Sequence, residues 1–315
     1  MRAIVFAYQE LGYICLEQVL KAGYDVAAVV THPDNPGEEI WFRSVAELAR
    51  RNNIPVMEAE SFKKADWYDG IAALRPDIMF SFMFRKMIHS DILALAPKGA
   101  FNLHPSYLPK YRGRCPANWV LVNGETETGL TLHRMVKSAD AGAIAAQVKV
   151  PITPDDDVRS LYAKFAAVLP DFIAKALLDI KEGRHTETPQ NDAEATLFGG
   201  RKPDDGIIDW TNPAPLIYNL IRAVAHPYPG AFCDMGEQGK LFIWQSAPLM
   251  RSALERTGNP GTVLSVNPLS VECGEGILVP KILQWESGSE LSAQQFVKFY
   301  NLKPGDLITA RSNAK

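Results

Sequence analysis

The fold of this chain is set by its first strand–helix–strand stretch, which reads RAIVFAYQELGYICLEQVLKAGYDVAAVVTH over residues 2–32. The apolar runs at 2–8 and 25–32 predict buried strands. Between them, residues 11–23 carry a helical pattern that ends at Gly23, a residue typical of helix C-termini. A helix that joins two buried strands forms a right-handed crossover, so this stretch predicts a parallel sheet.

The same alternation continues through the first 150 residues. The pattern predicts helices over 44–53 and 67–76, and strands over 54–57, 77–82 and 99–104. It then predicts a pair of strands at 129–135 and 141–152, and a helix at 157–183 that is interrupted at Pro170. We therefore expect an α/β fold with a doubly wound, mostly parallel sheet. Such sheets bind their ligands at the carboxyl ends of the strands, near a topological switch point.

The pattern changes after the polar stretch 185–206, which contains Pro and paired Gly residues and which we interpret as a linker. A helix predicted at 215–225 precedes short apolar runs at 231–235, 240–250, 261–274 and 277–287, and a second helix follows at 292–300. The close spacing of these runs is typical of a small β-barrel. We therefore expect two domains, residues 1–203 and residues 204–315.

Composition narrows the class of protein. The chain has 315 residues, of which 47% are hydrophobic and 22% charged, so it can bury a sizeable core. Its net charge of −3 means that the chain lacks the overall positive charge expected of a protein that binds nucleic acid. The four cysteines form no CxxC pair, and neither a signal peptide nor a long apolar segment is evident. We expect a reduced, cytoplasmic enzyme without a membrane span.

Nucleotide fingerprints that often accompany such a fold are missing from the sequence. The loop after the first strand reads AYQELGY and lacks the GxGxxG pattern that cradles a dinucleotide pyrophosphate. The chain also has no GxxxxGK[ST] motif of the P-loop type. We therefore expect no NAD and no P-loop triphosphate.

The densest polar cluster, FNLHPSYLPKYRGRCPANW at 101–119, follows a predicted strand. Asn102 and His104 stand two residues apart at the end of that strand, so their side chains leave the same face. Asp140 lies in the loop SADAG, where Gly142 permits a sharp turn. These residue types suit acyl transfer to an amine, because a histidine can move the proton and an asparagine can donate to the oxyanion. A nearby carboxylate favours the imidazolium and orients its ring.

Structural interpretations of the same residues stay open at this point. Asn102 could cap a turn, and Asp140 could form an ordinary Asx-turn. The positive charges of Arg112 and Arg114 could be a solvated surface run. A metal site built from His104, His133 and Asp140 lacks a recognised ligand spacing, so we expect no metal.

The strings AFNLHPSYLPKYRG, NGETETG and SADAG resemble the folate-dependent formyltransferases, a family that includes methionyl-tRNA, glycinamide ribonucleotide and sugar N-formyltransferases. The resemblance covers most of the chain. The strings THPDNPGE, FGGRKPDDG and PYPGAF are most similar to the formyltransferase domain of the bifunctional polymyxin-resistance enzyme, which formylates UDP-4-amino-4-deoxy-L-arabinose. The bifunctional enzyme continues into a decarboxylase domain with a dinucleotide fingerprint, and this sequence contains no such fingerprint, so a stand-alone transformylase acting in lipid A modification is expected.

The resemblance implies an OB-like C-terminal domain, 10-formyltetrahydrofolate as the donor, and roles for individual residues. Asn102 is implied to polarise the formyl oxygen, His104 to transfer the proton, and Asp140 to raise the basicity of His104. The implied folate contacts, made largely through the backbone, are Lys86, Met87, Ile88, Arg114, Val136, Lys137, Ser138, Ala139 and Asp140. Pro105 and Tyr107 depart from the usual residues of the polymyxin-resistance domain, and this leaves the identity of the acceptor amine open.

Three other functions are weighed against formylation of a nucleotide-linked amino sugar. Residues 204–315 contain nine basic and eleven acidic side chains. A domain that binds tRNA should be basic, so methionyl-tRNA formylation ranks lower. A formyltetrahydrofolate hydrolase would use the same Asn, His and Asp residues. A non-catalytic binding module should have lost one of the three, yet all are present. The sequence leaves the oligomeric state undetermined.

Overall fold

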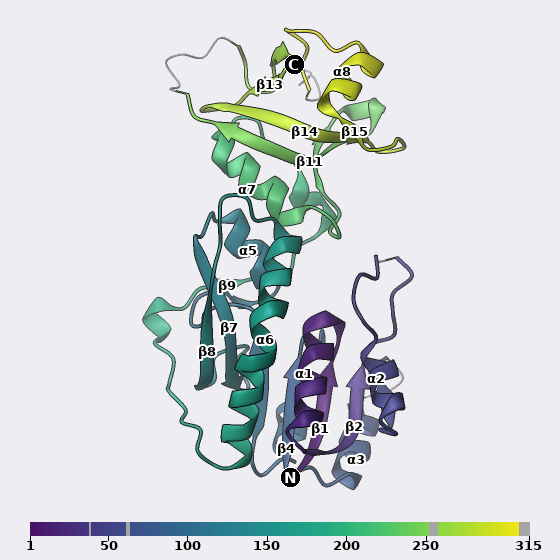
Figure 1. Ribbon diagram of the computed structural model, residues 1–315, viewed down its shortest axis with the longest axis vertical. Coiled ribbons are helices and arrows are strands. Elements are labelled where there is room, and N and C mark those ends of the chain that lie inside the picture. The colour runs from purple at the N-terminus through teal and green to yellow at the C-terminus, as the bar shows by residue number, and fades with distance from the viewer. Residues whose placement is uncertain (38, 61–63, 252–257, 309–315) are drawn as a thin grey trace. The chain divides into compact units, whose positions relative to one another are not determined.

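The computed structural model describes residues 1–37, 39–60, 64–251 and 258–308 (Figure 1). The chain groups into two compact units. Unit 1 contains residues 1–116, 127–152 and 162–199, and unit 2 contains residues 117–126, 153–161 and 200–315. Each unit is described by itself below. The predicted domain boundary between residues 203 and 204 stays a prediction.

Unit 1 is built on a seven-stranded sheet with the order β3-β2-β1-β4-β5-β7-β8. Its strands are β1 (Arg2–Ala7), β2 (Asp25–Thr31), β3 (Val56–Glu58), β4 (Ile78–Phe82), β5 (Ala100–His104), β7 (Glu127–Arg134) and β8 (Ile144–Pro151). The ladders from β3 to β5 are parallel, and β7 and β8 add on as antiparallel strands. The chain runs from β1 out to β3 and returns to β4 on the other side of β1. This topological switch confirms the predicted doubly wound, mostly parallel sheet.

Helices cover both faces of this sheet. They are α1 (Gln9–Lys21), α2 (Val45–Arg51), α3 (Lys64–Ala73), α4 (Ser90–Leu93) and α6 (Val158–Lys181). Alternate residues of the strands face opposite ways, so Ile4 and Phe6 pack in one cluster with Ile71 of α3 and Ile92 of α4. Figure 1 shows α1 and α6 in front of the sheet. Gly12 allows α1 to approach closely, because a Cβ there would lie 2.9 Å from the carbonyl oxygen of Phe82.

The prediction that Pro170 interrupts the long helix is wrong, because α6 continues through it from Val158 to Lys181. A proline inside a helix costs about 3 kcal/mol. Phe165, Leu169, Ile173 and Leu177 lie one turn apart and are fully buried, and this packing outweighs the cost. No helix within the described ranges, α6 included, is long and apolar enough to cross a membrane.

Residues 185–199 belong to unit 1 and pair with its strands, so interpreting 185–206 as a linker throughout is wrong. Thr188 forms an antiparallel bridge with Ile144. A short 3₁₀ turn follows at Asp192–Glu194. Strand β9 (Leu197–Phe198) then pairs in parallel with β6 (Arg112–Gly113), which lies in the polar cluster described above.

Unit 2 contains a separate antiparallel sheet with the order β10-β11-β14-β13-β12, and β15 pairs with β14. Its elements are α5 (Pro116–Val122), η2 (Pro203–Gly206), α7 (Ala214–Val224), β10 (Ala231–Asp234), η3 (Gly236–Gln238), β11 (Lys240–Leu249), β12 (Val263–Val266), β13 (Leu269–Glu272), β14 (Ile277–Trp285), β15 (Leu291–Ser292) and α8 (Ala293–Tyr300). Helix α7 packs against β10, β11 and β14, and α8 packs against β13, β14 and β15. The predicted second region of short strands is confirmed as a separate antiparallel sheet.

Candidate active site

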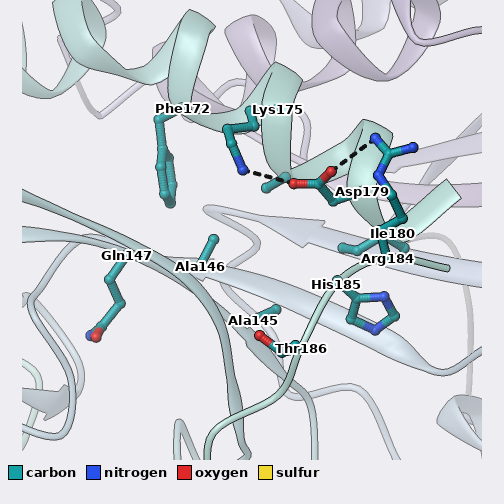
Figure 2. Close-up of a pocket in the computed structure, with 11 residues that line it drawn as sticks. Ala145, Ala146, Gln147, Phe172, Lys175, Asp179, Ile180, Arg184, His185 and Thr186 are labelled. Atoms are coloured by element: carbon teal, nitrogen blue, oxygen red, sulfur yellow. Dashed lines mark hydrogen bonds and ion pairs between the residues drawn. The ribbon is translucent and has the colours of Figure 1, made fainter. Parts of the chain in front are cut away.

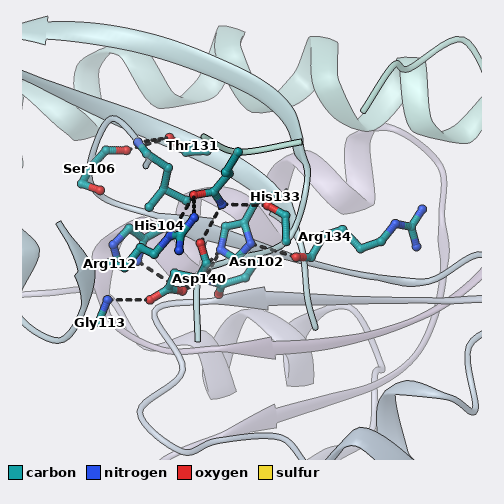
Figure 3. A network of polar contacts seen from close by, with 12 residues as sticks. Asn102, His104, Ser106, Arg112, Gly113, Thr131, His133, Arg134 and Asp140 are labelled. Atoms are coloured by element: carbon teal, nitrogen blue, oxygen red, sulfur yellow. Dashed lines mark hydrogen bonds and ion pairs between the residues drawn. The ribbon is translucent and has the colours of Figure 1, made fainter. Parts of the chain in front are cut away.

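Asn102, His104 and Asp140 meet at the carboxyl end of β5 (Figure 3). Asn102 lies opposite His133 of the neighbouring strand β7, and His104 lies opposite Thr131. The loop after β7 brings the Asp140 carboxylate back over this edge. Its Oδ1 atom is 3.6 Å from Nδ1 of His104 and 3.4 Å from Nδ2 of Asn102. The structure thus brings together the three residues that the sequence singled out.

The Asp140 carboxylate is held by its backbone and by its neighbours. Asp140 adopts the left-handed conformation with a φ of 52°, and the N–H of Gly113 donates to its Oδ2 at 2.8 Å. The turn requires a glycine at position 142, because a Cβ there would lie 1.8 Å from the carbonyl oxygen of Arg134. Burial by itself raises the pKa of the Asp140 carboxyl. His104, His133 and the Gly113 N–H outweigh burial and bring that pKa well below its usual range.

The His104 ring is oriented by a main-chain carbonyl. Its Nε2–H donates to the carbonyl oxygen of Tyr111 at 2.7 Å, so the neutral ring carries its lone pair on Nδ1. His104 is only 4% exposed. Burial lowers its pKa below the usual value of about 6.5, and His133 adds to this effect. Asp140 and the Tyr111 carbonyl act in the opposite direction without cancelling the shift. We predicted that the carboxylate would favour the imidazolium. Asp140 does raise the pKa of His104, but burial has a larger effect in the opposite direction.

His133 completes the cluster below Asn102. Its Nδ1–H donates to the carbonyl oxygen of Arg134 at 2.9 Å, and its Nε2 lies 3.4 Å from Oδ1 of Asp140. In the neutral ring this Nε2 is an acceptor. The Nδ2 group of Asn102 donates to that Nε2 at 3.2 Å. The amide of Asn102 therefore divides its two N–H groups between His133 and Asp140.

Sequence reasoning missed two groups of this cluster. It considered His133 only as a metal ligand, although its place in the strand pair opposite Asn102 was a usable signal. The role of the Tyr111 carbonyl could not be predicted, because the sequence does not specify the φ of 61° that directs this carbonyl toward His104. Among the described residues, no group of three or more His, Cys, Asp or Glu side chains is placed to hold a metal ion.

Four of the predicted folate contacts, Lys86, Met87, Ile88 and Lys137, line a pocket of about 540 Å³. Ala59, Trp67, His89, Ser90 and Ile92 complete its described lining. Ile88 is buried, whereas Met87 is 74% exposed and forms an apolar rim. The Lys86 ammonium lies 3.3 Å from Glu60 and donates to the carbonyl of Ala59. The pocket has an apolar interior and two lysines at its wall.

The other predicted contacts lie outside this lining. Val136, Ser138 and Ala139 are exposed in the loop that leads to Asp140. Arg114 is also exposed, and its backbone N–H donates to the carbonyl of Phe198.

A second cavity, of about 460 Å³, lies between β8 and the C-terminal half of α6 (Figure 2). Lys175 and Arg184 line it, and both pair with Asp179, at 2.8 and 3.0 Å. None of the predicted site residues lines this cavity. The single Asp179 carboxylate serves both cations, and Arg184 also pairs with Glu182.

Comparisons with known proteins give a consistent result. Residues 1–177 match the family model described as formyl transferase, and residues 201–301 match the model described as formyl transferase, C-terminal domain. The structure is similar to WlaRD, a sugar 3N-formyl transferase solved in the presence of dTDP and 5-N-formyl-THF, with 20% identity and a TM-score of 0.66 over 89% of this chain and 97% of that one. It is also similar to an N-formyltransferase from Helicobacter canadensis in complex with folinic acid and dTDP-3-aminofucose, with 22% identity and a TM-score of 0.66 over 89% of this chain and 98% of that one. HypX from Aquifex aeolicus, solved with tetrahydrofolic acid, matches 99% of this chain and 51% of its own length at 16% identity, with a TM-score of 0.62.

Proposed function

This chain belongs to the formyl transferase family, and on that premise we propose that it transfers the formyl group of 10-formyltetrahydrofolate to the amine of a nucleotide-linked amino sugar. The observation that carries the proposal is the meeting of Asn102, His104 and Asp140 at the carboxyl end of β5. A sugar substrate is supported by WlaRD and the Helicobacter canadensis enzyme, whose complexes contain a formylated folate with dTDP or a dTDP-amino sugar.

His104 is proposed as the proton-transfer group. Burial keeps its pKa low, so at neutral pH its Nδ1 carries a lone pair that can accept a proton. The amine nitrogen attacks the formyl carbon, a C–N bond forms, and the amine proton passes to Nδ1. The C–N10 bond then breaks, and the same proton passes to the leaving N10. Between these steps the imidazolium is stabilised by Asp140 at 3.6 Å and by the Tyr111 carbonyl at 2.7 Å.

Asn102 is proposed as the donor to the developing oxyanion. Its Nδ2 donates to His133 at 3.2 Å and more weakly to Asp140 at 3.4 Å. The weaker of the two bonds is the one we propose to be redirected to the formyl oxygen as its negative charge develops. Deletion of such a donor costs about 3–4 kcal/mol of transition-state stabilisation.

The donor is proposed to occupy the pocket of about 540 Å³ beside Lys86, Met87, Ile88 and Lys137. The apolar lining, which includes Trp67, suits an aromatic ring system, and the two lysines suit the carboxylates of a folate tail. Arg114 and the exposed loop 136–139 are proposed to add contacts once the donor is bound.

The acceptor is proposed to be UDP-4-amino-4-deoxy-L-arabinose, which would give the enzyme a cytoplasmic role in lipid A modification. The support is the similarity of THPDNPGE, FGGRKPDDG and PYPGAF to the polymyxin-resistance domain. The acidic excess in residues 204–315 disfavours tRNA as the acceptor. The boundary of the two domains is proposed to follow residue 203.

The test is tetrahydrofolate release by the purified protein with 10-formyltetrahydrofolate and a panel of acceptors. The panel contains UDP-4-amino-4-deoxy-L-arabinose, dTDP- and GDP-linked amino sugars, glycinamide ribonucleotide, charged initiator tRNA, and a reaction without acceptor. Turnover with the UDP sugar alone supports the full proposal. Turnover with another amino sugar keeps the reaction and rejects the arabinose. Turnover with tRNA, or free formate at full rate without acceptor, rejects sugar formylation.

A further inference from the structure

We infer that the segment Thr188–Phe198 is a strap that positions the catalytic pair, and that Gln190 is its principal positioning residue. The inference rests on the proposed function, and it concerns residues that the family resemblance did not assign. The strap lies 48 or more residues from the catalytic residues in sequence, and it contacts the backbone that presents each of them.

Gln190 holds the loop of Asp140. Its Nε2 donates to the carbonyl oxygen of Asp140 and to that of Gly142, both at 2.7 Å. Its Oε1 accepts from Nε and Nη2 of Arg112, at 3.0 and 2.8 Å. These four hydrogen bonds use the whole capacity of a side-chain amide. One side chain therefore joins the Asp140 turn to the residue that precedes Gly113, the main-chain donor to the Asp140 carboxylate.

The far end of the strap holds the group that orients His104. The hydroxyl of Thr196 accepts from the N–H of Tyr111 at 2.8 Å. The Phe198 ring stacks on the Tyr111 ring, with centroids 4.9 Å apart and planes at 10°. These contacts fix the Tyr111 backbone, whose carbonyl receives the Nε2–H of His104.

The strap acts where the backbone is strained. Asp140 and Tyr111 have φ values of 52° and 61°, a left-handed conformation that an L-residue adopts only at an energetic cost. Such conformations persist only where surrounding contacts determine them. The strap contributes contacts at both positions, so together with the Gly113 N–H it holds the His104 ring and the Asp140 carboxylate at their distance from each other. A strap that served only for stability would have no need to contact both residues.

The test compares Gln190→Met, which keeps the length of the side chain but loses the four hydrogen bonds, with the wild type. Asn191→Ala is the matched control, because Asn191 is exposed and its side chain hydrogen-bonds to Ala193 and Glu194 within its own turn rather than to the Asp140 loop. In Gln190→Met we expect kcat to fall at least about tenfold while KM for the donor stays within about twofold. Asn191→Ala is expected to keep both constants.

The second measurement is the titration of His104, followed by NMR in the folded protein without substrate. If Gln190 had a purely structural role, its substitution would leave the pKa of His104 unchanged. Asp140 raises the pKa of His104 against the effect of burial, so a carboxylate released from its position lowers that pKa further. We expect this downward shift in Gln190→Met and none in Asn191→Ala. Because it needs no turnover, this readout separates failure of the strap from failure of the proposed reaction.

Thr196→Val keeps the test decisive if Gln190→Met does not fold. Thr196 is exposed, and valine preserves its shape while removing the acceptor for the Tyr111 N–H. We expect a several-fold loss of kcat at an unchanged melting temperature. An unmoved His104 titration in a folded Gln190→Met protein, equal effects in Gln190→Met and Asn191→Ala, or full activity in Thr196→Val would each overturn the assignment.

Discussion

Asp140→Asn tests how much of the reaction depends on the charge beside His104. The two side chains are 3.6 Å apart, too far for a good hydrogen bond, so the carboxylate acts on the ring mainly through its charge. At an effective dielectric constant of about 20, a unit charge at this distance stabilises an imidazolium by about 4–5 kcal/mol. Asparagine is isosteric and can still accept from the Gly113 N–H, so the loop should keep its shape.

We expect kcat/KM to fall about 10²- to 10³-fold in Asp140→Asn, because the imidazolium formed in the transition state loses most of that stabilisation. In the wild type, kcat/KM should be flat above neutral pH and fall with an apparent pKa below about 6.5. The variant should move this acid limb to lower pH, because neutral His104 is then protonated less readily. The assay is tetrahydrofolate release from pH 5 to 9. Asp179→Asn, which removes a carboxylate paired with Lys175 and Arg184 in the second cavity, is the control.

Two results would refute this reasoning. Activity within about threefold of the wild type would mean that the charge of Asp140 does not stabilise the imidazolium. A large loss with an acid limb that stays in place would mean that Asp140 acts only on the shape of the loop.

Three further predictions follow from the same geometry. His104→Gln should lower kcat at least about 100-fold and abolish the acid limb of the pH profile, and an unchanged limb would assign it to another group. Gly142→Ala should destabilise the fold by at least about 3 kcal/mol, because the Cβ of the alanine would lie 1.8 Å from the Arg134 carbonyl oxygen. A melting temperature like that of the wild type would show that the turn relaxes easily. Lys137→Ala should raise KM for the donor by up to about fivefold at constant kcat, as expected for loss of an exposed ion pair, and an equal loss in kcat would place Lys137 at the reacting atoms instead.

The sequence allowed the strands of the first unit, their mostly parallel arrangement and the position of the candidate catalytic edge to be predicted. Apolar runs such as 2–8 and 77–82 are local signals, and their alternation with helical patterns determines a parallel sheet. Asn102 and His104 were found because the period of a strand places residues two apart on one face. Asp140 was singled out as a carboxylate in the loop SADAG, but only the family resemblance assigned it to His104, since nothing in its spacing links it to a strand 36 residues earlier.

What the sequence could not predict depends on long-range contacts. The strap has the polar, Pro- and Gly-containing composition of a linker, and only its partners at Tyr111, Arg112 and Asp140 reveal its role. Pro170 was expected to break a helix because local propensity ignores the burial of Leu169 and Ile173 beside it. The low pKa of His104 likewise depends on burial, a property of the packed fold rather than of the neighbouring sequence.

The central claim is that this chain transfers a formyl group to an amine through His104. The most direct test is tetrahydrofolate release with 10-formyltetrahydrofolate and the amino-sugar panel, run in parallel for the wild type and His104→Ala. The account predicts acceptor-dependent release by the wild type and a loss of at least about 100-fold in the variant. Release that persists in His104→Ala, or that needs no amine, would contradict it.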